Sequence, residues 1–117
     1  MRKNVVYDKS YSFALRIIKL RKYLIKEHRE YCLSDQILRS GTSIGAQVSE
    51  SEYAQSKADF IHKMSIALKE ANESRYWLSL LKDSDYISEE IFLSLYSDIE
   101  EILKLLTSIV RTSKGNR

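Results

Sequence analysis

Glutamate, histidine and cysteine residues are the side chains in this sequence that could support metal or covalent chemistry. Glu50 and Glu73 are candidates for the paired carboxylates with which helical bundles bind two iron or manganese ions. Such sites also need a Glu-x-x-His motif on two further helices, and neither His28 nor His62 has a glutamate three residues before it. Cys32 has only His28 nearby in sequence, and no serine lies in a GxSxG motif. The sequence therefore predicts no metal, no cofactor and no enzymatic activity.

A glycine pair in the stretch LRSGTSIGAQVSES raises the question of a phosphate-binding loop. A P-loop needs the pattern GxxxxGK[ST] after a strand, so that backbone amides surround the phosphates. Here Gly41 and Gly45 are one residue too close, and Ala46 and Gln47 follow them. We therefore expect a helix, although each glycine in a helix interior costs about 1 kcal/mol relative to alanine. Gly41 falls in the predicted core stripe, where the missing side chain allows a neighbouring helix to approach closely.

A basic stripe is the feature of this sequence that best fits a binding function. Residues 1–29 carry nine Lys and Arg against two acidic residues, whereas residues 30–117 carry ten against fourteen, and the net charge is +3. Such asymmetry can mark a surface that attracts polyanions, and a solvated helix face next to a basic tip explains it equally well. No helix-turn-helix, RRM or zinc-finger motif accompanies the stripe, so we expect phosphate contacts without base readout. The candidate nucleic-acid-binding residues are Lys9, Arg16, Lys19, Lys22 and Lys26.

Four amphipathic helices must position these residues. The chain has no proline and only three glycines, a composition typical of an all-α protein. Apolar residues recur at alternating spacings of four and three, as in a helical bundle. Similar lengths and short connections favour an antiparallel up-down-up-down four-helix bundle, with residues 1–117 as a single domain. The predicted helices cover about residues 8–26, 34–53, 57–82 and 89–111.

Local signals give the helix starts and the inward faces. Ser34, Ser56 and Ser88 are the predicted N-caps of the second, third and fourth helices. On the first helix, Tyr11 and Ile18 belong to a broad apolar face that we expect to pack inward.

The second and third predicted helices carry a second face that a monomeric bundle does not need. On the third helix this face is apolar around Trp77, and an exposed tryptophan among aliphatic residues usually marks a contact surface. We expect these faces to meet in a homo-oligomer; the alternative is that Trp77 covers one edge of the intramolecular core. The candidate interface residues are Ser43, Ala46, Glu50, Tyr53, Ile66, Glu73, Trp77 and Leu80.

The cellular compartment is predicted from the cysteine content and from the apolar runs. A single cysteine forms no internal disulfide, which suits a reducing cytoplasm. The N-terminal residues have no apolar signal-peptide core, and no run approaches the roughly 18 apolar residues of a membrane span. We expect a cytoplasmic protein with neither a membrane nor a small-molecule substrate as partner.

Three segments carry a resemblance to a known family, namely QILRSGTSIGAQVSES (36–51), DFIHKMSIALKEANESRYWLSLLKDSDYI (59–87) and YSFALRIIKL (11–20). Together they resemble the bacterial four-helix-bundle proteins encoded in intervening sequences of 23S rRNA genes. The stretch 36–51 resembles the family's hallmark, Q-L-R-R-A-A-x-S-I-x-A-N-I-A-E-G. Residues 59–87 and 11–20 are similar to its later and first helices. The match implies that Glu50 and Glu73 are the motif glutamates. It also aligns further motif positions, namely Arg39, Ser43, Ile44 and Ala46, with departures at Gln47, Ser49 and Ser51.

The resemblance implies a ring-like homopentamer whose molecular role is open. Association with ribosomal RNA is inferred for the family chiefly from gene location. A similar fold serves as the accessory protein of diversity-generating retroelements, a basic pentamer that binds nucleic acid and reverse transcriptase. We therefore expect a non-enzymatic oligomer that binds RNA or DNA through its first helix. A protein-interaction scaffold without a nucleic-acid role and a retroelement accessory protein are the alternatives.

Overall fold

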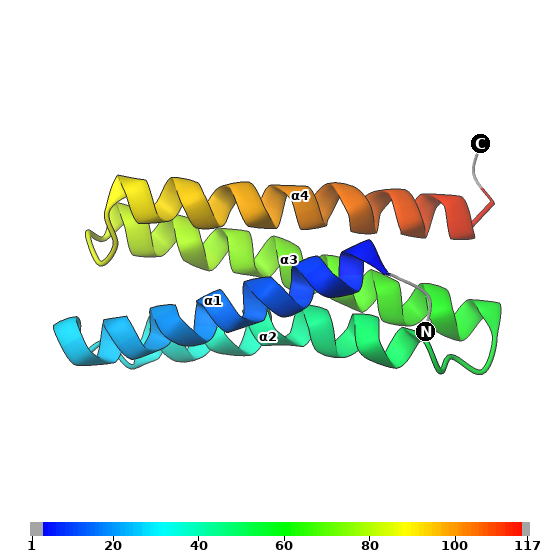
Figure 1. Ribbon diagram of the computed structural model, residues 1–117, viewed down its shortest axis with the longest axis horizontal. Coiled ribbons are helices and arrows are strands. Elements are labelled where there is room, and N and C mark those ends of the chain that lie inside the picture. Colours follow the sequence, from blue (N-terminus) through cyan, green and yellow to red (C-terminus); the bar gives the residue numbers. More distant parts are fainter. Residues whose placement is uncertain (1–3, 116–117) are drawn as a thin grey trace.

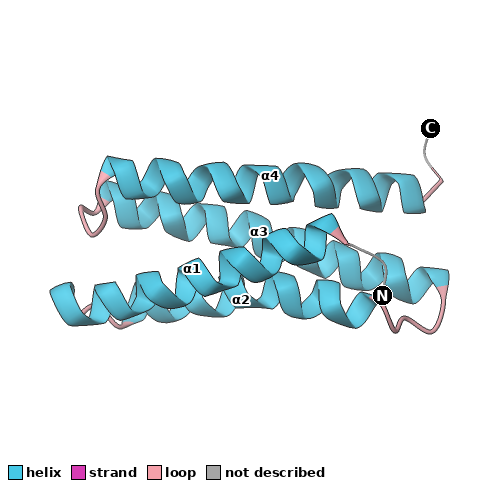
Figure 2. Ribbon diagram, in the orientation of Figure 1, coloured by secondary structure: helices cyan, strands magenta, loops and turns pink. Residues whose placement is uncertain are grey.

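Four α-helices make up the fold in the computed structural model, which describes residues 4–115. The described residues contain no β-strand, and short loops join the helices (Figure 2). The helices lie side by side along the 45 Å dimension of the molecule (Figure 1). The all-α prediction is thereby confirmed. The helices are α1 (Val5–His28), α2 (Cys32–Ser51), α3 (Lys57–Asp83) and α4 (Glu89–Ser113).

Side-chain caps define the starts of three helices. The Oγ atoms of Ser56 and Ser88 accept hydrogen bonds from backbone amides three residues later, at 3.0 and 3.1 Å, as predicted. Asn4 caps α1 in the same way, because its Oδ1 accepts a hydrogen bond from the amide of Tyr7 at 3.1 Å. The first helix consequently begins three residues before the predicted start at residue 8.

The predicted N-cap of α2 at Ser34 is wrong. The helix begins at Cys32, and Ser34 is a buried residue of its first turn, where its hydroxyl donates to the carbonyl of Tyr31. The carboxylate of Glu30 instead accepts hydrogen bonds from the backbone amides of Leu33 and Ser34, at 3.0 and 2.8 Å. A carboxylate before the helix thus satisfies the free amides of the first turn, so no serine is needed there.

The helices bury one continuous hydrophobic core, and two buried serines form a hydrogen bond between α2 and α3 within it. On α2 the buried residues Ile37, Gly41, Ile44 and Val48 follow the predicted alternating spacing of four and three residues. Between α2 and α3, the buried hydroxyl of Ser74 donates to Ser40 at 2.9 Å. Because the two hydroxyl groups pair with each other, these helices pack closely without leaving either buried serine unpaired.

Gly41 is the point of close approach between α1 and α2. A Cβ atom at this position would lie 3.0 and 3.1 Å from two side-chain carbons of Ile17, which is closer than such carbons normally pack. A Cβ atom at Gly45 would lie 3.4 Å from Ser10, an ordinary contact distance. The prediction that Gly41 allows a close approach of a neighbouring helix is therefore confirmed.

Two inward residues predicted for α1 lie on its surface. Tyr11 is 55% exposed and Ile18 is 38% exposed. The buried stripe of α1 runs through Phe13, Ile17 and Leu20, and the predicted apolar face was too broad because one stripe suffices to fill this side of the core.

The side of the bundle formed by α1 and α4 is packed less closely than the others. α2 packs against α1 and α3, and α4 packs against α3 and more sparsely against α1. The C-terminal half of α1 lies away from the N-terminal half of α4 (Figure 1). Within residues 4–115, no helix combines the length and apolar character of a membrane span.

Candidate functional site

Two residues of the predicted basic stripe are bound to acidic residues of α4. The Nζ atom of Lys9 lies 3.0 Å from a carboxylate oxygen of Glu101. Arg16 lies 2.6 Å from a carboxylate oxygen of Asp98, and its other terminal nitrogen donates to Ser94 Oγ at 2.9 Å. These contacts join α1 to α4, and they place a negative charge beside each of the two cations.

The other three residues of the stripe form a free basic surface. Lys19, Lys22 and Lys26 are exposed, and spacings of three and four place them on one side of α1. None of the three has an ion-pair partner among the described residues. We call Lys19, Lys22 and Lys26 the lysine triad. Among the described residues, these three of the five stripe residues present positive charge without an ion-pair partner.

A cleft of about 410 Å³ opens between α1 and α4, beside the lysine triad. Two nearly buried leucines, Leu20 and Leu95, are 6% and 3% exposed and form its apolar part. Arg16 and Lys19 of the stripe also line the cleft, as do Tyr23 and Ile91.

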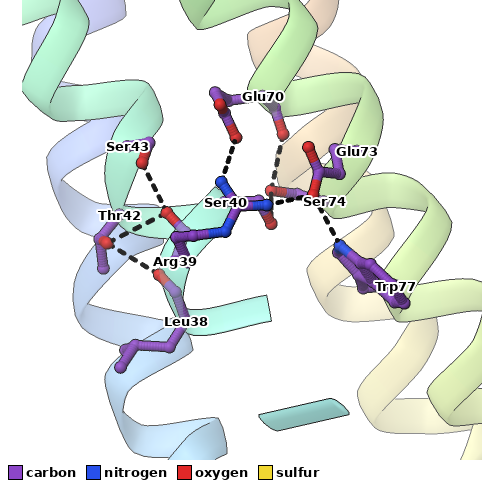
Figure 3. Close-up of polar contacts among 9 residues, drawn as sticks. All are labelled: Leu38, Arg39, Ser40, Thr42, Ser43, Glu70, Glu73, Ser74 and Trp77. Carbon is purple, nitrogen blue, oxygen red and sulfur yellow. Dashed lines mark hydrogen bonds and ion pairs between the residues drawn. The ribbon is translucent and has the colours of Figure 1, made fainter. Parts of the chain in front are cut away.

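Polar contacts on the outer face of α2 and α3 bring several predicted residues together. The guanidinium of Arg39 binds Glu73, and Trp77 Nε1 donates to the same glutamate at 3.2 Å (Figure 3). Arg39 also lies 3.5 Å from a carboxylate oxygen of Glu70. The motif arginine and one motif glutamate are therefore partners. The second motif glutamate, Glu50, is exposed and has no side-chain hydrogen bond or ion pair within residues 4–115.

The remaining candidate interface residues differ in exposure. Ala46 and Tyr53 are exposed, with Tyr53 at 83%. Ser43, Ile66 and Leu80 are half-buried. Trp77 is half-buried and packs against the core. Its partial burial within the protomer agrees with the alternative interpretation of Trp77, whereas Ala46, Glu50 and Tyr53 are exposed. We call the eight candidate interface residues, together with Arg39, the α2–α3 face.

Sequence reasoning missed the acidic partners and the aromatic side of the cleft. Ser94, Asp98 and Glu101 are spaced by four and three residues, so they share one face of α4. That spacing is a signal that they face a neighbouring basic helix. Tyr23 is interleaved with the basic residues in the sequence, but its place at the cleft was not predictable, because it depends on how far α1 lies from α4.

The described residues contain no group of three His, Cys, Asp or Glu side chains close enough to bind a metal ion. His28 instead makes edge-to-face contacts with two tyrosines, Tyr23 and Tyr86, at ring-centre distances of 5.6 and 5.3 Å.

Comparison with known proteins identifies a matching family and a similar solved structure. Residues 2–108 match the family model described as 23S rRNA-intervening sequence protein. A solved structure from Bacteroides thetaiotaomicron, described as a protein of unknown function from the S23 ribosomal protein family, is 57% identical. The similarity covers 91% of this chain and 98% of that chain, with a TM-score of 0.89. No curated protein gives a significant match. Neither description states a catalytic activity.

Proposed function

The chain belongs to the 23S rRNA-intervening sequence protein family, and on this premise we propose that it is a non-enzymatic, cytoplasmic RNA-binding protein that works as a ring-like homo-oligomer. Each subunit is an antiparallel up-down-up-down bundle that presents the lysine triad to RNA phosphates. The single observation that supports this function best is the contrast along α1. Lys9 and Arg16 are neutralised by α4, whereas the triad is exposed and unpaired among the described residues.

The charge of the triad suits a polyanion more than a small anion. Lys26 follows Lys19 by seven positions, so the triad extends over about 10 Å of helix at 1.5 Å per residue. Three lysines in a row give salt-dependent affinity without sequence readout. A single subunit would therefore bind weakly, and several subunits in one ring would bind one RNA much more tightly through multivalency.

The α2–α3 face supports self-association. Tyr53, just beyond the end of α2, is largely exposed, and Ala46 and Glu50, four residues apart on α2, are exposed on one side of that helix. Closed rings form from heterologous contacts that repeat around an axis. We propose that this face contacts a neighbouring subunit, and that the ring is a pentamer.

A binding experiment tests the nucleic-acid role. Fluorescence anisotropy with a structured RNA, at increasing salt, compares the wild-type protein with Lys19→Glu/Lys22→Glu/Lys26→Glu. We expect the variant to bind far more weakly, and we expect the wild-type affinity to fall steeply with salt. Equal binding by both proteins, or no wild-type binding at low salt, contradicts the proposal.

The competing proposal is a protein-interaction scaffold without a nucleic-acid role. The α2–α3 face favours it, because that face is partly apolar and contains no residue of the lysine triad. A wild-type protein that assembles but does not bind RNA at low salt supports the scaffold. A retroelement accessory role would add binding to a reverse transcriptase.

A further inference from the structure

We propose that the cleft between α1 and α4 binds an unpaired nucleotide, whose base enters the cleft while its phosphate contacts the lysine triad. The inference rests on the proposed function, and it specifies the class of ligand: single-stranded nucleic acid or a single-stranded loop, rather than a continuous duplex.

The cleft has the surfaces that a flat base requires. Its interior is apolar, since Leu20 and Leu95 are almost fully buried and Ile91 lies beside them. Tyr23, which is 37% exposed, also lines the cleft. Aromatic side chains that stand beside a basic groove are the usual platforms on which unpaired bases stack.

Arg16 supplies a second planar group. One terminal nitrogen lies 2.6 Å from Asp98 and the other donates to Ser94 at 2.9 Å, so the guanidinium is held in place. A guanidinium plane fixed in this way is a surface on which a base can stack. The charge of Asp98, which contacts Arg16, is compensated by that guanidinium.

Charge on the rim of the cleft matches a nucleotide in particular. Lys19 both lines the cleft and belongs to the triad, so it can bind the phosphate of a nucleotide whose base is inside. Lys22 and Lys26 continue along the same side of α1 and can bind the neighbouring phosphates. A continuous duplex keeps its bases stacked inside and offers only phosphates to the triad, so it leaves the cleft unused.

Single-stranded RNA carrying one 2-aminopurine is the direct probe. The wild-type protein is compared with Tyr23→Ala, and Tyr76→Ala is the matched control because Tyr76 is an exposed tyrosine of α3 outside the cleft. Loss of a stacking platform should weaken single-strand binding roughly 5- to 100-fold and abolish the quenching of 2-aminopurine. Duplex RNA of the same length should bind Tyr23→Ala and wild type equally. Tyr76→Ala should behave like wild type with both probes.

Failure of the inference and failure of the proposed function are distinguishable. If the triple Lys→Glu variant loses RNA binding but Tyr23→Ala binds the single strand as wild type does, only the cleft inference is overturned. If wild type binds neither RNA at low salt, both are overturned.

A single-stranded DNA of the same sequence tests whether the site needs the ribose 2′-hydroxyl. Quenching with both strands supports a site for unpaired nucleotides in general, and quenching with RNA alone supports a site that contacts the 2′-hydroxyl.

Photocrosslinking keeps the test valid if Tyr23→Ala folds poorly. A single-stranded RNA with 4-thiouridine is crosslinked to wild-type protein, and the labelled peptides are identified by mass spectrometry. We expect crosslinks to peptides that contain Tyr23 or Ile91. Crosslinks confined to other parts of the chain overturn the inference.

Discussion

Replacement of each glycine of α2 by alanine separates helix propensity from packing. Both substitutions add one methyl group to the same helix, and each gains about 1 kcal/mol of helix propensity. At Gly45 the new Cβ meets Ser10 at an ordinary distance of 3.4 Å, so we expect Gly45→Ala to stabilise the protein by about 1 kcal/mol. At Gly41 the new Cβ lies 3.0 and 3.1 Å from Ile17, and overpacking of a dense core costs about 1–3 kcal/mol.

The expected difference between the two variants is therefore about 1–3 kcal/mol, with Gly41→Ala no more stable than wild type. Urea unfolding followed by circular dichroism measures it from the midpoints, provided that the slopes agree. Gly41→Leu adds a branched side chain at the same place and should prevent folding of the subunit. If both alanine variants are stabilised equally, the contact between Gly41 and Ile17 does not limit the approach of the helices, and the packing argument is refuted.

Three further predictions concern assembly, pH and capping. Ala46→Leu, on the exposed side of α2, should lower the assembly state in analytical ultracentrifugation while the helical content stays unchanged; a fully assembled variant contradicts the proposed interface. The Arg75 side chain donates to Glu100 at 2.9 Å and lowers the pKa of that carboxyl below its usual 4.5. The ion pair therefore stabilises the fold at pH values above 4.5, and this stabilisation is lost as the pH falls through the lowered pKa. Glu100→Gln should consequently lose less stability than wild type between about pH 5 and pH 3 in urea titrations, and a parallel loss contradicts this. Glu30→Ala removes the acceptor for two amides of α2 and should cost about 0.5–2 kcal/mol in the same assay, whereas an unchanged midpoint rules out a capping role.

The helices and much of the core were predictable because they depend on local periodicity. The caps at Ser56 and Ser88, and the place of Gly41 in the core stripe, follow from residue types within one helix. The start of α2 was not predictable from its serine, because the carboxylate of Glu30 reaches the amides only after the chain has turned. Local pattern alone gives no such geometry.

The candidate site was only partly predictable for the same physical reason. Spacing identified all five cations on one face of α1, but charge compensation depends on which helix lies opposite. Lys9 and Arg16 face α4 and its carboxylates, whereas the lysine triad faces outward. The pairing of Arg39 with Glu73 likewise joins residues of two helices.

The salt dependence of RNA binding in two charge-matched variants tests the central claim most directly. Lys22→Gln/Lys26→Gln removes two free lysines, and Lys9→Gln/Arg21→Gln removes two cations that are paired with Glu101 and Asp35. Both variants lose the same net charge. With a single-stranded RNA, the first should lower the magnitude of the slope of log affinity against log salt by roughly 1.4, at about 0.7 for each lost phosphate contact, and the second should leave it almost unchanged. Equal reductions in both variants would show that overall charge, rather than the lysine triad, attracts the RNA, and would contradict the account.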